Sequence, residues 1–514
     1  NRQLSFGGQM RNKQAFKNLW GNLLLQIIVA FSGLILPRFF LNKYGSTVNG
    51  MINSVSQFLT YLNLVEAGIS SAAIVELYGP LNENDTGAIN SVLSALQKFY
   101  YKSGAAYIIL LVLLTVVYPM FVANQIDSLE TRILILILAA SNLVDFFFIK
   151  YRVLLTADQR GYVIFLSQAA ATLVNMGVSI LLIKLGCSFI LVKGVATGLY
   201  IARFIFVYAY ARRRYNFLNF KTGFQKGLLK QRWAALIHQI VGVIVNNTDI
   251  VILTLFMGVT SLQEVSVYTT YNMVAVSLTS LLSVFSNGIT SSFGSLIFSN
   301  DKKALKNAYS NYEYFYMIVL FCIYTCCAVL LLPFVGLYTA DVNDGVQYVR
   351  QNIAFLFVIL GLMQNIRIPS LTMICAAGHF KETQSRAIFE AVINIAVSLA
   401  LIKPLGMAGI LMGTIVSYFY RSLDCIIYNS KYLVNDTLKL SFRRIIRNVI
   451  VSLGIIVVIF KFFSPNPGNL LEWFVLAVIT VAVSGGLILG INAAFEPSQI
   501  KQLFSRVKSV LKRA

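Results

Sequence analysis

One apolar stretch decides the fold class: residues 232–258 read RWAALIHQIVGVIVNNTDIVILTLFMG. This run is long enough to cross a bilayer, which takes about 20 apolar residues. Asn246, Asn247, Thr248 and Asp249 interrupt it with amide, hydroxyl and carboxylate groups. A carboxylate in hydrocarbon is strongly disfavoured unless it faces protein or water, so the stretch predicts a polar cavity inside a membrane protein.

The composition of the whole chain supports this interpretation. Of its 514 residues, 57% are hydrophobic and only 12% are charged, and the mean hydropathy is +0.72. These values lie outside the range of soluble globular domains. The formal net charge of +22 could indicate nucleic-acid binding, but no solvated stretch is long enough to form a basic domain. We therefore predict an all-α polytopic membrane protein that binds no nucleic acid.

Apolar runs predict about fourteen transmembrane helices. Alternate loops between these runs hold most of the 42 Lys and Arg residues, and the positive-inside rule places those loops and both termini in the cytoplasm. No short apolar core with a cleavage site precedes the first run, so we expect that run to direct insertion. The predicted helices are 18–42, 48–78, 100–123, 132–155, 162–184, 189–210, 233–258, 264–298, 312–338, 350–377, 384–403, 407–428, 445–463 and 470–494.

The two halves of the chain resemble each other in the same orientation. The pattern Asn-x-x-Val-Ser-x-x-Leu-Ile-Lys begins at Asn175 and again at Asn394. Six helices per half in the same order predict two parallel lobes related by an axis along the membrane normal, with a substrate site between them. We predict a first lobe at 1–210, a basic cytoplasmic linker at 211–232, a second lobe at 233–430, two further helices at 431–494 and a basic cytoplasmic tail at 495–514.

Charged residues within the predicted helices are candidate site residues, because a charge in hydrocarbon needs a polar partner. Arg38 and Asp249 are expected at similar depth in opposite lobes, as a salt bridge closing an outer gate, a cation for substrate or an ion-coupling carboxylate. Arg367 is about ten residues from either charged helix end, too far for its side chain to reach water easily. It is either a cavity cation for phosphate or the partner of a residue such as Glu390 or Asp145.

Acidic residues and their polar neighbours are candidates for ion coupling or gating. Glu66, within the predicted helix 48–78, is either a proton or Na⁺ site or a fixed countercharge to one of the two arginines above. Asn247 and Thr248 flank Asp249 and share its predicted role.

Two further arginines have two possible roles each. Arg152 and Arg203 lie towards the inner ends of their helices, where they either extend to the cytoplasmic headgroups or line an inward-open cavity. Arg421 and Asp424 are three residues apart on one predicted helix, so we expect them to form a structural pair.

Polar side chains are unusually frequent in two predicted helices. Asn53 and Gln57 belong to 48–78, and Tyr271 and Asn272 belong to 264–298. Amides, hydroxyls and tyrosine faces suit sugars, although close packing of small residues explains part of the pattern. We predict that these four residues line a sugar-binding cavity.

Enzyme signatures are absent from the sequence. It contains no glycine-rich phosphate loop, HExxH, CxxC pair or Gly-x-Ser-x-Gly, and it has only two histidines. We therefore predict a protein that is not an enzyme and uses no cofactor and no metal. An ion gradient, the membrane potential or removal of product would supply its energy.

Three short motifs resemble a known family: Leu36-Pro37-Arg38, Asn247-Thr248-Asp249, and AAGHFKET at 376–383. With twelve helices in two parallel lobes and two extra helices, they resemble bacterial polysaccharide transporters (Wzx-type) of the MOP exporter superfamily. The resemblance implies a MATE/MOP-like fold and a flippase that carries undecaprenyl-pyrophosphate-linked oligosaccharide units outward across the bacterial plasma membrane. It also implies alternating access without ATP hydrolysis, for surface polysaccharide biosynthesis.

The partners expected from this resemblance are the polyprenyl-pyrophosphate-linked oligosaccharide, membrane lipids, H⁺ or Na⁺, and a polysaccharide polymerase or glycosyltransferases. Two rival functions share the fold: an ion-coupled multidrug or small-molecule antiporter, and a flippase of the peptidoglycan precursor. A membrane-embedded glycosyltransferase would need a large extramembrane loop, whereas the predicted outer loops are short. The buried charge is mainly cationic, which favours an anionic substrate over a drug.

Overall fold

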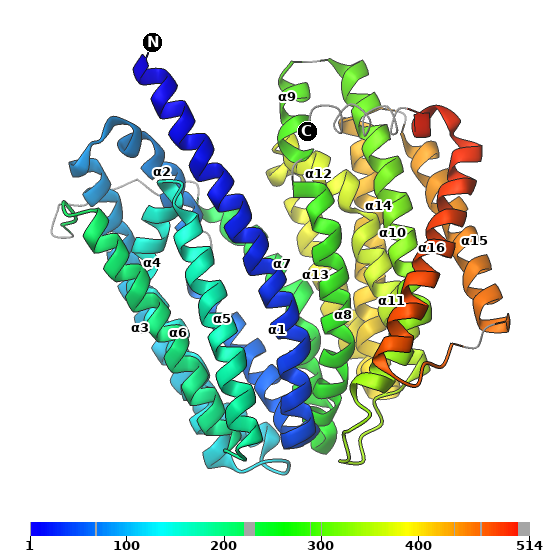
Figure 1. Cartoon of the computed structure of the whole chain (residues 1–514), viewed down its shortest axis with the longest axis horizontal. Helices are drawn as coiled ribbons and strands as arrows, with labels where there is room; N and C mark the ends of the chain where they lie inside the picture. Colours follow the sequence, from blue (N-terminus) through cyan, green and yellow to red (C-terminus); the bar gives the residue numbers. More distant parts are fainter. Residues whose placement is uncertain are drawn as a thin grey trace. The chain divides into compact units, whose positions relative to one another are not determined.

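The computed structural model of the chain describes residues 2–66, 69–219, 232–287, 289–299, 301–435, 437–462 and 465–501. Regular secondary structure in these ranges is entirely helical (Figure 1). Eleven helices in the described part are long and apolar enough to span a membrane, and Ile240–Phe256 is a shorter apolar helix. The chain is thus a multi-pass helical membrane protein, while the count of about fourteen spans stays a prediction.

The chain divides into two compact units, of which the first comprises Asn1–Ser266 and Val342–Asp344. A 3-10 turn, Asn63–Glu66, precedes its second helix, and another, Gly258–Thr260, follows its seventh. The helices of this unit are α1 (Arg2–Leu62), α2 (Ile69–Glu83), α3 (Thr86–Val122), α4 (Ser128–Ala157), α5 (Gly161–Lys184), α6 (Phe189–Arg214) and α7 (Arg232–Phe256).

Helix α1 contains a sharp break that separates two predicted helices. Gly45 has φ 78° and ψ 178°, a conformation open to glycine because it lacks a Cβ. The helix restarts at Ser46, whose backbone N–H donates to Oδ2 of Asp344 over 2.6 Å. A Cβ on Gly50 would lie 1.7 Å from the carbonyl oxygen of Leu262. Glycine at 50 therefore lets α1 pack directly on the chain that begins α8.

The second unit comprises Val267–Asp341 and Gly345–Ala514. Its first helix, α8 (Ser261–Asn287), begins in the first unit. The others are α9 (Ile289–Phe298), α10 (Lys302–Tyr338), α11 (Gln351–Ile366), α12 (Ile368–Ala376), α13 (Phe380–Leu405), α14 (Met407–Tyr432), α15 (Leu438–Phe462) and α16 (Leu470–Phe495).

Two predicted helices consist of shorter pieces within the described residues. The predicted helix 350–377 is α11 and α12, joined at Arg367, and Pro369 stands in the first turn of α12. Proline removes a backbone donor and so interrupts a continuous helix. The predicted helix 48–78 is also divided, because α1 ends at Leu62, the 3-10 turn Asn63–Glu66 follows, and α2 begins at Ile69.

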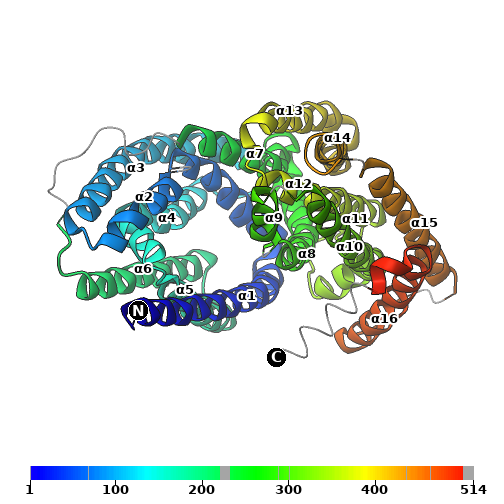
Figure 2. The same cartoon turned by 90° about the horizontal axis from the view of Figure 1, so that it is seen from above.

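A buried ion cluster attaches α15 and α16 to α10. Nη1 of Arg444 lies 2.9 Å from Oε2 of Glu313, and Nη2 lies 2.6 Å from Oε2 of Glu496. Nη2 of Arg447 lies 2.9 Å from Oε1 of Glu496, and Ser441 donates to Glu313 over 2.5 Å. Both views place α15 and α16 beside α10 (Figures 1 and 2). The last two helices are therefore integral to the second unit.

Candidate functional site

Polar residues join α1 to α7 inside the first unit. The hydroxyls of Tyr61 and Thr248 are 2.7 Å apart, as are those of Ser54 and Thr254. Asp249 is buried, with 4% of its surface exposed. The acidic residue of the interrupted stretch thus faces protein, as its position in an apolar run requires.

Most amide side chains along this contact between α1 and α7 form hydrogen bonds within their own helix. Asn247 donates to the carbonyl of Val243 over 2.9 Å, and Asn53 donates to the carbonyl of Asn49 over 2.8 Å. Nε2 of Gln57 is different, because it is buried without a hydrogen-bond partner in the described residues. Among the described amide side chains at this contact between α1 and α7, that of Gln57 therefore has an unused hydrogen-bond donor.

Arg38 is half-buried on α1. It and Asp249 both belong to the first compact unit, because α7 packs on α1 there. The predicted lobe limits come from the sequence repeat, and they stay a prediction. A gate formed by Arg38 and Asp249 also stays a prediction.

A second polar cluster lies in the first unit, around the end of the 3-10 turn that precedes α2. Nη1 of Arg152 is 2.5 Å from Oδ2 of Asp145, with side chains 33% and 20% exposed. Glu66 has electrostatic interactions with both of these residues and a hydrogen bond with Tyr100. Arg152 is therefore within electrostatic reach of Glu66, while the predicted roles of Glu66, a proton or Na⁺ site or a countercharge to Arg38 or Arg367, stay predictions.

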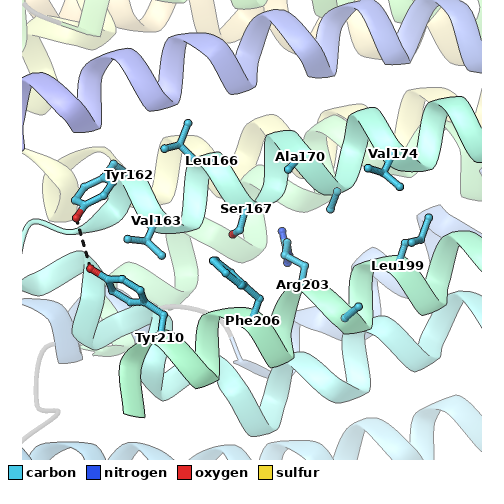
Figure 3. A pocket seen from close by; sticks show the side chains of 12 residues that line it. Tyr162, Val163, Leu166, Ser167, Ala170, Val174, Leu199, Arg203, Phe206 and Tyr210 are labelled. Atoms are coloured by element: carbon cyan, nitrogen blue, oxygen red, sulfur yellow. Dashed lines mark hydrogen bonds between the residues drawn. The ribbon is translucent and has the colours of Figure 1, made fainter. Parts of the chain in front are cut away.

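Arg203 lines a groove of about 540 Å³ between α5 and α6 (Figure 3). Of the twelve lining residues, Arg203 alone is charged, and apart from Ser167 and two tyrosines the rest are apolar. The hydroxyls of these tyrosines, Tyr162 and Tyr210, meet at 3.5 Å at one end of the groove (Figure 3). The groove is thus an apolar channel that contains one cation.

Arg203 and Arg152 belong to one electrostatic cluster. Asp145 and Arg152 both act electrostatically on the Arg203 guanidinium, whose central carbon lies 4.4 Å from the ring centroid of Phe204. Arg152 thus pairs with Asp145, whereas Arg203 contacts the ring of Phe204. Whether these arginines line a cavity or extend to the headgroups stays a prediction.

Arg367 belongs to a chain of alternating charges in the second unit. It pairs with Glu390, and Nε of Arg421 lies 3.5 Å from the other oxygen of Glu390. Nη1 of Arg421 is 2.7 Å from Oδ2 of Asp424, which also pairs with Arg386. The predicted pair Arg421–Asp424 is confirmed, as is the alternative pairing of Arg367 with Glu390. Three arginines against two carboxylates leave one positive charge in excess, and Nε of Arg367 has no hydrogen-bond partner in the described residues.

Tyr271 is packed among residues of the second unit in this structure, and its predicted place in a sugar cavity stays a prediction. Its side chain is completely buried, its hydroxyl donates to the carbonyl of Tyr348 over 2.7 Å, and it accepts the backbone N–H of Arg350 over 3.0 Å. The ring stacks on Phe357 with centroids 5.5 Å apart. This face of the ring is therefore covered by Phe357 in the structure. Asn272 is half-buried, and its role stays a prediction.

Charged and polar groups buried inside a many-helix membrane protein are typical of functional sites. The chain is similar to the lipid II flippase MurJ in an inward closed conformation, with a TM-score of 0.64 and 14% identity over 94% of this chain and 99% of that chain. It is also similar to an inward-facing multidrug resistance MATE family transporter of the MOP superfamily, with a TM-score of 0.61 and 11% identity over 84% and 98% of the two chains.

A third similar structure is a mutant of the Vibrio cholerae MATE transporter VcmN, with a TM-score of 0.54 and 12% identity over 84% and 98% of the two chains. No family model and no curated protein matches the chain. At these identities the likeness establishes the fold. The chain therefore has the fold of the MOP superfamily transporters, which confirms that part of the prediction, while the two-lobe layout stays a prediction.

Proposed function

We propose that this protein is a flippase that moves undecaprenyl-pyrophosphate-linked oligosaccharide units outward across a bacterial plasma membrane, for surface polysaccharide biosynthesis. It would work by alternating access, with both termini in the cytoplasm and a polysaccharide polymerase or glycosyltransferases as partners. The MOP fold supports transport in general. The choice of an anionic lipid-linked substrate depends on the residues.

The groove that contains Arg203 is the observation that carries this proposal. An undecaprenyl pyrophosphate combines a long apolar chain with a compact anion, and the groove combines apolar walls with one guanidinium. Guanidinium groups bind phosphate oxygens bidentately and stay charged in apolar surroundings. A site for a cationic drug would need the opposite charge.

The cluster around Arg203 suggests how the anion is bound and released. Arg152 is already paired with Asp145, so an arriving pyrophosphate competes with a carboxylate for the same cation. Such competition limits the affinity, which a transporter needs in order to release its substrate. Protonation or Na⁺ binding at Glu66 or Asp249, beside Asn247 and Thr248, would shift this balance and couple it to an ion gradient.

The remaining predicted site residues complete the proposal. Arg38 and Arg367 are proposed as further cations for the pyrophosphate. Asn53, Gln57 and Asn272 are proposed to contact the sugar, and the unused donor of Gln57 supports its part in this.

A flippase of the peptidoglycan precursor is the second candidate, because the lipid II flippase MurJ is similar over 94% of this chain. Both candidates carry a polyprenyl pyrophosphate and use the groove in the same way. They differ in the sugar, so parallel assays with the two glycolipids separate them.

The test is translocation in proteoliposomes by wild type, Arg203→Ala, Arg203→Lys and the control Arg132→Ala, which removes an exposed arginine of α4. Loss of a charge-assisted hydrogen bond lowers binding by about 1.5–3 kcal/mol, so Arg203→Ala should slow translocation about 10- to 150-fold. Lys should restore part of the rate, and Arg132→Ala should resemble wild type. Unchanged translocation in Arg203→Ala would refute the role of the groove, and export of cationic drugs without glycolipid transport would establish the antiporter instead.

A further inference from the structure

Helices α15 and α16 enclose a second groove, of about 720 Å³, in the other compact unit. Its apolar lining includes Ile446, Ile450 and Phe495, whose side chains are 56%, 65% and 66% exposed. Exposed apolar side chains of this size on a membrane helix are suited to contact with an acyl chain. The proposed flippase function does not use this groove.

Three cations stand along one side of the same groove. Lys439, Arg443 and Arg447 follow each other at intervals of four residues, so they share one face of α15. Like charges at this spacing repel one another. The described residues that line the groove include no carboxylate. The arrangement therefore favours an anion placed beside these three side chains.

Arg447 adds an independent sign of a missing partner. Only 9% of its surface is exposed, and its Nη2 bonds to Asn492 and Glu496 at 2.5 and 2.9 Å. Its Nε and Nη1 are buried and have no hydrogen-bond partner within the described residues. Buried N–H groups of an arginine are nearly always bonded, so two unused donors indicate an acceptor supplied from outside the chain.

We propose that this groove binds an anionic phospholipid. Its phosphate would accept hydrogen bonds from Arg447 and Arg443 and attract Lys439, while an acyl chain would lie on Ile446, Ile450 and Phe495. The cations occupy the beginning of α15, which the proposed topology places at the cytoplasmic leaflet, where anionic lipids are attracted by basic side chains.

A glycerophospholipid fits this groove better than the long polyprenyl carrier. The lined part of α15, from residue 438 to 451, spans only about 20 Å at 1.5 Å per residue. The bound lipid would also stabilise the last two helices, because Arg447 shares Glu496 with Arg444 in the cluster that attaches them to α10.

Full-length protein in detergent tests the proposal through retention of lipid in native mass spectrometry and through the unfolding temperature. Phosphatidylglycerol should stay bound and raise the unfolding temperature, whereas phosphatidylcholine should do neither. The double variant Lys439→Gln/Arg443→Gln removes two exposed cations and should weaken phosphatidylglycerol binding about 30-fold. Ile450→Trp keeps the charges and fills the groove, and it should also lower retention.

The matched control is Lys302→Gln/Lys303→Gln, which removes two exposed cations at the start of α10 and should bind phosphatidylglycerol like wild type. Equal losses in both double variants would show a general surface charge and overturn the proposal. Equal retention of phosphatidylcholine, or retention of undecaprenyl phosphate in place of phosphatidylglycerol, would overturn it as well. None of these measurements needs transport, so failure here and failure of the flippase proposal are distinguishable.

Discussion

Arg152 and Asp145 lie two helical turns apart on α4 and form an ion pair of 2.5 Å. The pair uses only one carboxylate oxygen, because Oδ1 of Asp145 is buried without a hydrogen-bond partner in the described residues. Arg203, which lines the groove between α5 and α6, is within electrostatic reach of both. Asp145 thus sets how much positive charge is available to an anion in that groove.

Replacing Asp145 should therefore strengthen anion binding and slow release. In Asp145→Asn we expect half-maximal translocation at a lower glycolipid concentration, together with a lower maximal rate, in the proteoliposome assay. Glu130→Gln, on the first turn of α4, should leave both quantities unchanged. A weaker apparent affinity in Asp145→Asn would contradict this role.

The contact between Gly50 and the first turn of α8 predicts a strong steric effect. A Cβ there would lie 1.7 Å from a backbone carbonyl oxygen, whereas a Cβ on Gly33 of the same helix would meet nothing within 4 Å. We expect Gly50→Ala to unfold at a clearly lower temperature, while Gly33→Ala should be neutral or slightly stabilising. Thermal unfolding in detergent measures both, and equal stability of the two variants would exclude the close approach.

Arg444 should be essential for stability rather than for transport. Arg444→Met leaves Glu313 and Glu496 buried without this cation, a change that typically costs about 3–5 kcal/mol. We expect low membrane abundance and a large fall in unfolding temperature. Lys461→Met, at the exposed end of α15, is the control and should fold normally.

The same cluster predicts loss of stability in acid. Burial alone would raise the pKa of Glu496, but hydrogen bonds from Arg444 and Arg447 hold that pKa below its ordinary value of 4.5. A lowered carboxyl pKa contributes stability above the unfolded-state value, and this contribution is lost as the pH falls through the folded-state value. Unfolding temperatures should thus drop below about pH 4.5. Glu496→Gln should unfold at a lower temperature at neutral pH and lose less on acidification.

Tyr271 should contribute to stability rather than to transport in the same unfolding and translocation assays. Tyr271→Phe removes the hydrogen bonds with Tyr348 and Arg350, which we expect to lower stability by about 1–3 kcal/mol. Translocation per folded molecule should stay at the wild-type level. A selective loss of glycolipid transport at normal stability would place this residue in the binding site.

Apolar length and periodicity were sufficient to predict helix and membrane insertion, because both follow from the composition of each segment alone. They could not locate the breaks. The break at Gly45 depends on the approach of Asp344, almost three hundred residues away, and the joint at Arg367 combines a nearby proline with an ion pair to α13. Such interactions depend on tertiary contacts that hydropathy does not record.

Prediction of the candidate site was limited in the same way: features within one segment could be predicted from the sequence, whereas contacts between segments could not. A charge in an apolar run identified Arg152, Arg203, Arg367 and Asp249, since each needs a partner. Pairing was predictable where both residues share a helix, as with Arg421 and Asp424. The spacing of seven residues places Asp145 and Arg152 on one face of α4 and is a sequence signal for their pairing. Nothing in the sequence marked Tyr100 as the partner of Glu66.

The attachment of α15 and α16 to α10 also constrains biogenesis. Glu313 enters the membrane with α10, but its principal cation, Arg444, follows 131 residues later in the chain. During synthesis, α10 is therefore made before the residue that neutralises its buried carboxylate, and the ion pair with Arg444 can form only after α15 has been synthesised. A chain that ends after α14 lacks Arg444, so the carboxylate of Glu313 in α10 would be without the cation that neutralises it.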